Sequence, residues 1–531
     1  ARYQLACVNS QPTTKAKSVL FHPKEPPPGL ARGGLTVLFT IMCIIDLFGV
    51  FPVITLPKSV ISCGIYGIPM VIGVIGLQLY TAVLLGRSWL LAQEITPIIK
   101  EKNRYPYAAV AELAFGPAGR RAVTFILNAT VFGSGIPNFI LAAQSLQLFW
   151  WKITGGGVGV TYCVWMLLLA LLLCPVMWLG SPKDMKPVAI SSVVIVSTVA
   201  LSTWICILLD DVTPPSAGTV LDYTPNAEDF LIAYGILAFQ FDIHPMLLTI
   251  QVDMRDSRQI NKAVLGGFAI TGVMFTVTAL LAANRYGMDV DSNILQGIPP
   301  SIPLYLVALL VTLQLCLSSA VGNSVLFQQI EDSLKIPRTF CVQRCLIRSG
   351  IVAVAVFLAE AVPRFDLVMG LVGSTLTGPL MFIFPPLFFL KLCYIKSRMS
   401  QNDPKRLAKN KLLNKENGVV NGNKQNGAWR NGDLSKMPLI FSDSLRKYRT
   451  FSNYINTKYL EIDNDCTQDE YSVKWYDVLL AIIVMTMGIG ATVVATYSSW
   501  ANSIEYYSYS PPCLVNATVA ARSFLEFTFQ S

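Results

Sequence analysis

Long apolar segments recur along this chain of 531 residues and constrain its fold more than any other feature. The chain is 53% hydrophobic and 14% charged, with a mean hydropathy of +0.51, which is too apolar for a soluble protein of this length. A helix of about 20 apolar residues is long enough to cross the hydrocarbon core of a bilayer. The sequence therefore predicts an all-α polytopic membrane protein with about eleven transmembrane helices, at residues 34–62, 66–95, 120–150, 158–179, 186–209, 227–253, 259–285, 301–331, 345–362, 366–395 and 474–499.

The distribution of lysine and arginine predicts the orientation of these spans. Cytoplasmic loops carry an excess of both residues. With the N-terminus in the cytoplasm, the loops expected inside include "SPKDMKP" and "DMRDSRQINK", whereas the expected outer loop "DDVTPPSAGTVLDYTPNAED" has neither lysine nor arginine. An odd number of spans then places the C-terminus outside the cell or in a lumen, where Asn516 begins a usable glycosylation sequon.

The order of the spans divides the chain into six predicted regions. They are a disordered cytoplasmic N-terminus (1–32), a first group of five spans (33–209), a second group of five (227–395), a basic and partly disordered cytoplasmic loop (396–473), the eleventh span (474–499) and an outer tail (500–531). In the loop, Tyr459 to Ile462 resembles a tyrosine-based sorting signal for trafficking adaptors. Cys63, near an outer helix end, and Cys513, in the tail, are candidates for a disulfide.

Helix-breaking residues and an acid lie together in the middle of the first span, in "CIIDLFGVFPVITLPKSV". Asp46 lies about 18 Å along this span at the rise of an α-helix. Pro52 lacks an amide hydrogen and clashes with the carbonyl four residues earlier, so the helix is expected to open near Gly49. Backbone groups uncovered in lipid cost several kcal/mol each unless protein or a water-filled cavity satisfies them. The stretch therefore predicts a broken helix beside a polar cavity.

The sixth span repeats this combination in "YGILAFQFDIHPMLLTIQVDM", with Gly235, Asp242, His244 and Pro245. Because it comes five spans later, it crosses the membrane in the direction opposite to the first span. Two interrupted helices at corresponding positions of antiparallel halves indicate an inverted-repeat transporter. The polar ends of such a break suit a zwitterion, because half-helix N-termini attract anionic groups and uncovered carbonyls attract cations.

Three stretches resemble the amino acid/auxin permease family, which includes the vesicular inhibitory amino acid transporter and the proton-coupled amino acid transporters. They are "FPVITLPKSVISCGIYG", "FDIHPMLLTIQVDMRDSRQINKA" and "LVGSTLTGPLMFIFPPLFFLK". The resemblance covers nearly the whole membrane region. It implies a leucine-transporter-like fold of five plus five inverted repeats with an eleventh helix added, and helices 1 and 6 broken. It also implies transport of small neutral amino acids by alternating access.

The two breaks supply the predicted site residues. Asp46, Asp242 and His244 are candidates for proton coupling, because burial and charged neighbours can bring an acid or a histidine into the working pH range. The alternatives are a protonated Asp46 bonded to a neighbouring helix, and an Asp242–His244 pair that satisfies carbonyls freed by Pro245. The predicted substrate-binding residues are Asp46, Phe48, Gly49, Val50, Phe51, Phe239, Gln240, Asp242 and Asn128. The resemblance adds a sodium site at Ser318 and Ser319.

Several function classes find no support in the sequence. No nucleophile–base pair or metal cluster lies near the breaks, which argues against an enzyme, and no basic patch interleaved with aromatic residues suggests nucleic acid. We expect the bilayer and a small amino acid as partners, and H⁺ or Na⁺ as a coupling ion without any cofactor. The leading hypothesis is a proton-coupled amino acid transporter of the plasma membrane or of a vesicular or lysosomal membrane. A sodium-coupled transporter and a non-transporting sensor that signals through residues 396–473 are the alternatives.

Overall fold

The computed structural model describes residues 34–505 apart from 98, 100–104, 155–161, 179–184, 211–219, 221–222, 337–339, 363 and 402–474. The predictions for residues 1–32, for Tyr459 to Ile462, for Asn516 and for most of the 396–473 loop lie outside these residues. The described chain is almost entirely helical, and its one β-bridge joins Leu35 to Met254.

The first predicted span consists of three helical pieces, which are α1 (Val37–Phe48), α2 (Phe51–Ile54) and α3 (Leu56–Ile61). Helix α1 ends where Gly49 takes a φ of 60°. Pro52 and Pro57 each stand within the first two positions of a new piece, where a missing amide hydrogen costs no intrahelical bond. The prolines therefore restart the helix after each interruption.

The other helices follow the apolar segments of the sequence, with boundaries within a few residues of those predicted except in α5 and at the ends of α15 and α18, which extend further. They are α4 (Gly67–Ile95), α5 (Pro106–Thr154), α6 (Tyr162–Trp178), α7 (Met185–Leu209), α8 (Ala227–Gln240), α9 (His244–Asp253), α10 (Ile260–Tyr286), α12 (Ile302–Ser333), α13 (Val342–Ala361), α14 (Phe365–Val372), α15 (Phe384–Gln401) and α18 (Trp475–Glu505). A short helix, α11 (Ile294–Gly297), lies in the loop before α12. Two π-helical pieces, η5 (Gly373–Thr377) and η6 (Pro379–Ile383), connect α14 to α15.

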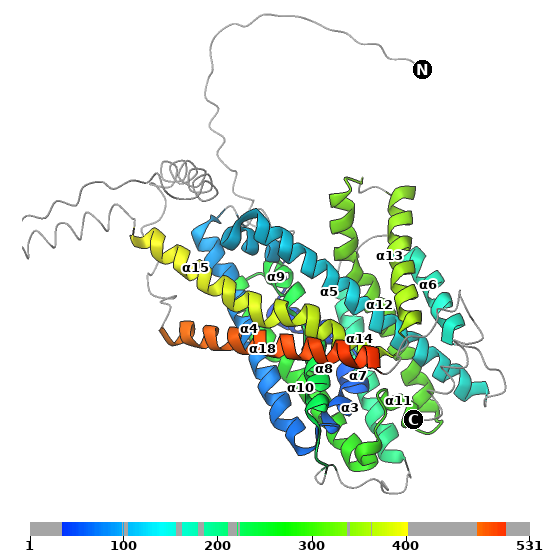
Figure 1. Ribbon diagram of the computed structural model, residues 1–531. Helices are drawn as coiled ribbons and strands as arrows, with labels where there is room; N and C mark the ends of the chain where they lie inside the picture. The colour runs from blue at the N-terminus through cyan, green and yellow to red at the C-terminus, as the bar shows by residue number, and fades with distance from the viewer. Residues whose placement is uncertain are drawn as a thin grey trace, which may run out of the picture.

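Within the described residues, nine helical segments are long and apolar enough to cross a membrane, and α1 and α6 are shorter apolar helices. The chain is thus a multi-pass membrane protein. The predicted number of about eleven is reached only when these two shorter helices are counted as spans. Figure 1 shows α15 and α18 running side by side across the front of the bundle, with α8 behind them.

Helix α5 begins earlier than the predicted span 120–150. Its first part, from Pro106, was expected to lie in an inner loop, but it is a helix that bends at Gly116, where φ is 75° and ψ is −166°. The buried Tyr107 anchors this part through its hydroxyl, which donates to the carbonyl oxygen of Leu380 at 2.8 Å. The stretch "PYAAVAELAF" consists mainly of small and apolar residues, which suit a packed helix better than a solvated loop.

The segment α1–α3 runs antiparallel to the segment α8–α9 over its whole length. The start of α1 pairs with the end of α9, and the two interruptions meet in the middle. The end of α3 lies against the start of α8. Three contacts establish this order: Leu35 with Met254, Phe48 with Gln240, and Cys63 with Asp229. Both interruptions therefore lie at the same depth of the bundle.

Cys63 is a free, buried thiol, which corrects the suggested disulfide with Cys513. Its sulfur lies 3.6 Å from the carbonyl oxygens of both Ser59 and Asp229, which share its one hydrogen. The thiol is therefore directed into the helix packing. Cys163, at the start of α6, is disulfide-bonded.

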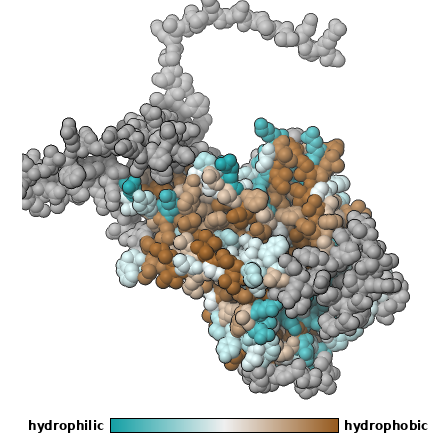
Figure 2. All heavy atoms as spheres, in the orientation of Figure 1, coloured by the Kyte–Doolittle hydropathy of each residue, from teal (hydrophilic) through white to brown (hydrophobic). Residues whose placement is uncertain are grey.

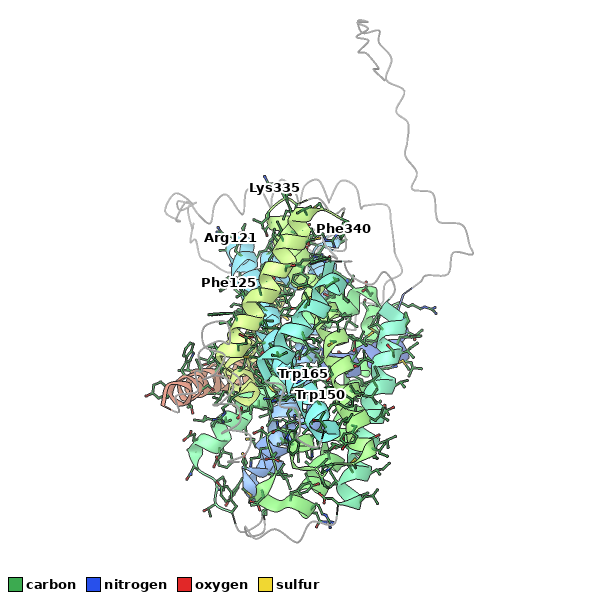
Figure 3. The ribbon with its side chains drawn as sticks, turned by 90° about the vertical axis from the view of Figure 1, so that its right-hand side faces the viewer. Arg121, Phe125, Trp150, Trp165, Lys335 and Phe340 are labelled. Atoms are coloured by element: carbon green, nitrogen blue, oxygen red, sulfur yellow. The ribbon has the colours of Figure 1, made fainter. Side chains whose placement is uncertain are left out.

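Apolar side chains cover much of the visible surface in Figure 2, and hydrophilic residues gather mainly toward its upper and lower margins. In Figure 3, Arg121 of α5 and Lys335, just after α12, lie near the same end of the bundle as Phe340. Trp150 and Trp165 lie well below them, with ring centroids 5.9 Å apart. Basic residues gathered at an end of the bundle are typical of a loop outside the hydrocarbon core.

Candidate functional site

A cavity of about 140 Å³ lies between the two interrupted segments. Its wall comes from the α1–α2 and α8–α9 junctions, from α5 and α12, and from one residue of η5. The lining residues are Leu47, Phe48, Gly49, Val50, Phe51, Thr130, Val131, Ser134, Gly135, Asn138, Phe239, Gln240, Asp242, Pro245, Met246, Gln314, Leu315, Ser318, Ser319, Gly322, Asn323 and Thr377.

At the first interruption, Gly49 allows the chain to leave the helix. Its φ of 60° lies in a region that side chains with a Cβ rarely adopt, and a Cβ there would meet only the carbonyl oxygen of Asp46, at 3.8 Å. Glycine is therefore required here by the backbone conformation and not by a lack of space. The carbonyl oxygen of Phe48 accepts a hydrogen bond from Gln240 Nε2 at 2.9 Å, so a group at the end of α1 is satisfied from α8.

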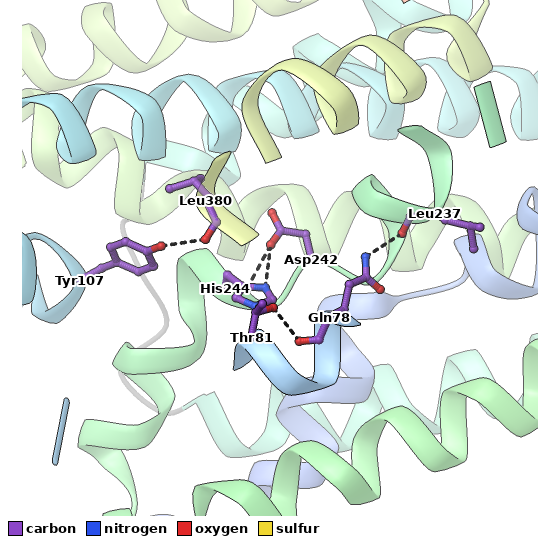
Figure 4. Close-up of polar contacts among 7 residues, drawn as sticks. All are labelled: Gln78, Thr81, Tyr107, Leu237, Asp242, His244 and Leu380. Carbon is purple, nitrogen blue, oxygen red and sulfur yellow. Dashed lines mark hydrogen bonds and ion pairs between the residues drawn. The ribbon is translucent and has the colours of Figure 1, made fainter. Parts of the chain in front are cut away.

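At the second interruption, Asp242 lies between α8 and α9, and its side chain bonds the first backbone amide of α9. One carboxylate oxygen of Asp242 accepts from the backbone amide of His244 at 3.1 Å and lies 3.4 Å from His244 Nδ1. The other ring nitrogen, Nε2, lies 3.1 Å from the hydroxyl oxygen of Thr81 on α4. Figure 4 shows this chain of contacts, in which the imidazole of His244, with no exposed surface, stands between Asp242 and Thr81.

A second polar contact from α4 supports the end of α8. Gln78 Nε2 donates to the carbonyl oxygen of Leu237 at 3.2 Å, one turn from Thr81 (Figure 4). Both Gln78 and Thr81 are fully buried. Helix α4 thus holds the two sides of the second interruption through Leu237 and His244.

The cavity combines one acid with neutral polar groups and aromatic rings. Asp242 is the one ionisable side chain among its described lining residues. Hydroxyl and amide groups come from α5 and α12, and the rings of Phe51 and Phe239 meet edge to face with centroids 6.3 Å apart. Such a wall offers a small solute a charge partner, hydrogen bonds and an apolar contact.

The structure brings most of the predicted site residues to this cavity. Those in its wall are Phe48, Gly49, Val50, Phe51, Phe239, Gln240, Asp242, Ser318 and Ser319. His244 lies outside the wall, directly behind Asp242.

Asp46 and Asn128 are not among the lining residues. Asp46 Oδ1 accepts from Gln314 Nε2 at 3.3 Å, and the same nitrogen donates to Ser192 Oγ at 2.6 Å, so Asp46 faces α7 and α12. Asn128 lies on α5 shortly before the lining residues Thr130 and Val131 and is partly buried, but it is not itself part of the wall.

The residues of α5 and α12 that complete the wall follow a helical repeat. On α5 they recur every four residues, at Thr130, Ser134 and Asn138, and α12 repeats this spacing at Gln314, Ser318 and Gly322. Helical residues four apart share a face, so this spacing is the signal that points to Thr130 and Gly322. Thr377 of η5 has no such signal, because a π-helical turn changes the spacing.

Known proteins with a similar sequence are amino acid transporters. "Amino acid transporter AVT1B" of Arabidopsis thaliana is 25% identical over 54% of this chain and 53% of that protein. "Vacuolar amino acid transporter 3" of Schizosaccharomyces pombe is 25% identical over 32% of this chain and 26% of that protein. The chain spans about half the length of AVT1B and of the related AVT1C, 53% of each.

A solved structure is also similar, that of MhsT in complex with L-phenylalanine, with a TM-score of 0.48 and 10% identity over 88% of this chain and 99% of that chain. The family model "Transmembrane amino acid transporter protein" matches residues 35–409, which hold the cavity and both interrupted segments. This match covers more than half of the chain, and the chain therefore belongs to the transmembrane amino acid transporter family, which is a family of transporters and not of enzymes.

Proposed function

We propose that this protein is a secondary-active transporter of small neutral amino acids or related zwitterions, driven by protons. The observation that carries the proposal is the cavity between two antiparallel interrupted segments, with Asp242 as its ionisable lining group, in a chain of the amino acid transporter family. The family match and the relatives' names favour an amino acid as the solute.

The size and chemistry of the cavity favour a small substrate. Pockets for drug-sized ligands measure about 300–1,000 Å³, and this one measures about 140 Å³. The ammonium group of the solute pairs with Asp242, and its carboxylate meets the backbone near Gly49. Phe51 and Phe239 then contact the side chain of the solute, which limits its length.

Proton coupling is assigned to the acid and the imidazole at the second interruption. Asp242 faces the cavity and His244 stands behind it, so a proton gained from the cavity can be shared between Asp242 Oδ1 and His244 Nδ1, which lie 3.4 Å apart. Asp46 remains a proposed second coupling residue. It acts through Gln314, which contacts Asp46 and also lines the cavity.

Alternating access requires one end of the cavity to close while the other opens. The start of α1 and the end of α9 are joined by two backbone hydrogen bonds, Leu35 N to Asp253 O at 2.8 Å and Arg255 N to Leu35 O at 3.0 Å. With the N-terminus in the cytoplasm, this joint closes the inner side. Residues 33–209 and 227–395 then act as the two repeats, and each repeat begins with an interrupted helix.

The name of the fission yeast relative favours a vacuolar or lysosomal membrane for this protein.

Uptake of radiolabelled amino acids into proteoliposomes tests the proposal. An imposed proton gradient, inside alkaline, is compared with no gradient, each with and without sodium. Uptake that needs the proton gradient and ignores sodium supports the proposal. Uptake that needs sodium and ignores pH contradicts the coupling and favours a sodium site at Ser318 and Ser319, both in the cavity wall. Binding without uptake under every gradient contradicts transport and favours a sensor.

A further inference from the structure

Thr81 on α4 is buried beside the imidazole of His244 but does not line the cavity. Its hydroxyl oxygen lies 3.1 Å from His244 Nε2 and 3.1 Å from the carbonyl oxygen of Gln78. Because a hydroxyl has one hydrogen, the directions of these two contacts are linked. When the hydroxyl donates to the Gln78 carbonyl, its oxygen is left to accept a hydrogen from Nε2 of His244.

With its hydrogen on Nε2, a neutral His244 has a lone pair on Nδ1. That lone pair faces Asp242 Oδ1 at 3.4 Å. If Asp242 is ionised, two electron-rich atoms face each other and the contact is repulsive. One added proton, placed on either atom, turns the same contact into a hydrogen bond. The contact between Asp242 and His244 therefore requires a proton from outside the pair.

If Nε2 had no acceptor, the imidazole could adopt the other tautomer. Nδ1 would then carry the ring's own hydrogen and donate it to an ionised Asp242, and the contact would form without an added proton. The hydrogen-bond acceptor on α4 is therefore what makes the pair depend on a proton from the cavity, which Asp242 lines.

Few other charges face the pair among the residues that the structure describes. The one ion pair that Asp242 forms there is with His244, and the uncharged Thr377 of η5 lines the same cavity as Asp242. From α5, Tyr107 is the titratable neighbour of Asp242, and its hydroxyl is engaged with Leu380 O at 2.8 Å. The charged groups near the other end of α9, Asp253 and the η3 residue Arg258, lie about 14 Å or more along the chain from His244 at the α-helical rise.

We propose that Thr81 is a positioning residue for proton coupling, which holds His244 in the Nε2–H tautomer so that the Asp242–His244 contact closes only when a proton is bound. This role rests on the proposed function, because it presumes proton-driven uptake. It extends the set of coupling residues to α4, which packs against both α8 and α9.

The test measures proton-driven uptake at stepped external pH for the wild-type protein, Thr81→Val and Thr81→Ser. Valine keeps the shape and removes the acceptor, whereas serine keeps the hydroxyl. We expect Thr81→Val to move the pH midpoint of uptake toward acid by about one pH unit, since one neutral hydrogen bond corresponds to roughly that shift. Thr81→Ser should restore the wild-type midpoint.

Ser88→Ala is the matched control on the same helix. Ser88 is also fully buried, and its hydroxyl donates to the carbonyl oxygen of Leu84 at 2.8 Å, away from His244. Its removal should leave the midpoint unchanged, even where it lowers the melting temperature. If Thr81→Val does not reach the membrane folded, Thr81→Ala replaces it with the same expected shift.

The outcomes separate the two proposals. If uptake is proton-driven and its pH midpoint is the same in the wild-type protein and the Thr81 variants, the role of Thr81 is overturned and the proposed function stands. A wild-type protein whose uptake ignores the proton gradient would overturn both. A similar shift in Ser88→Ala would show that packing within α4 sets the midpoint, and would also overturn the role of Thr81.

Discussion

Gln240 donates a hydrogen bond from its Nε2 to the carbonyl oxygen of Phe48 at 2.9 Å, and this bond joins the two interrupted segments at their midpoints. Both residues are buried, at 4% and 1% exposure, and both line the cavity. One side chain therefore satisfies a carbonyl at the end of α1 and positions the first interruption against the second.

Replacing Gln240 by leucine should weaken both the fold and the site. The Phe48 carbonyl would lose a partner in a buried place, which costs about 1–3 kcal/mol. We expect a lower melting temperature of the purified protein and a reduced rate of uptake at saturating substrate. Gln93→Leu, near the end of α4 and outside the cavity wall, serves as the control. Equal losses in both variants would contradict a special role for Gln240.

Replacing Asp242 by asparagine should abolish proton-driven accumulation while the protein still folds. Asparagine keeps the shape and the capping oxygen for the His244 amide, but it carries neither the charge nor a titrating proton. Hydrogen bonds to charged groups contribute about 1.5–3 kcal/mol, so the affinity for a zwitterion should also fall about tenfold or more. Asp289→Asn, an exposed position between α10 and α11, is the control. Accumulation that survives in Asp242→Asn would remove this residue from the coupling step.

Asp46→Asn separates a coupling role from a packing role for this acid. Asp46 accepts from Gln314 Nε2, and an asparagine oxygen can accept the same hydrogen bond. If Asp46 titrates during transport, the variant should fold, reach the membrane and lose coupled uptake. Full proton-driven uptake by Asp46→Asn would mean that Asp46 serves only to hold α1 against α7 and α12.

Gly373→Ala should destabilise the bundle strongly, because η5 approaches α8 backbone to backbone. A Cβ at Gly373 would overlap the carbonyl oxygen of Gly235. Overpacking of this kind costs about 1–3 kcal/mol or more, so the melting temperature and the yield of folded protein should fall. Gly76→Ala is the matched control, since a Cβ at Gly76 meets nothing within 4 Å. A Gly373→Ala protein as stable as Gly76→Ala would contradict the close approach.

Much of the fold could be predicted because backbone amides and carbonyls in hydrocarbon must form hydrogen bonds within the protein. The apolar segments had to be helices, and Gly49 with Pro52 marked where the first of them is interrupted. Helix α5 was only partly predictable. Hydropathy located the part after Gly116, whereas the part from Pro106 is held by tertiary contacts such as Tyr107 to Leu380, which no local pattern reveals.

The candidate site was predictable where the backbone determines it. Gly49, Phe51, Phe239 and Asp242 belong to the interruptions and line the cavity. Asp46 was placed in the site by its depth and by its position beside the first interruption, and neither says which way a side chain faces. Thr81 gave no signal in the sequence, because one threonine in an apolar helix is ordinary until its neighbour is known to be His244.

A cryo-electron microscopy structure of the protein with its best-transported amino acid tests the central claim most directly. We predict density for the solute between the two interruptions, within hydrogen-bond distance of Asp242 and against Phe51 and Phe239. Density for the solute elsewhere in the bundle, or a helix that continues unbroken from Ile44 to Ser59, would contradict the account.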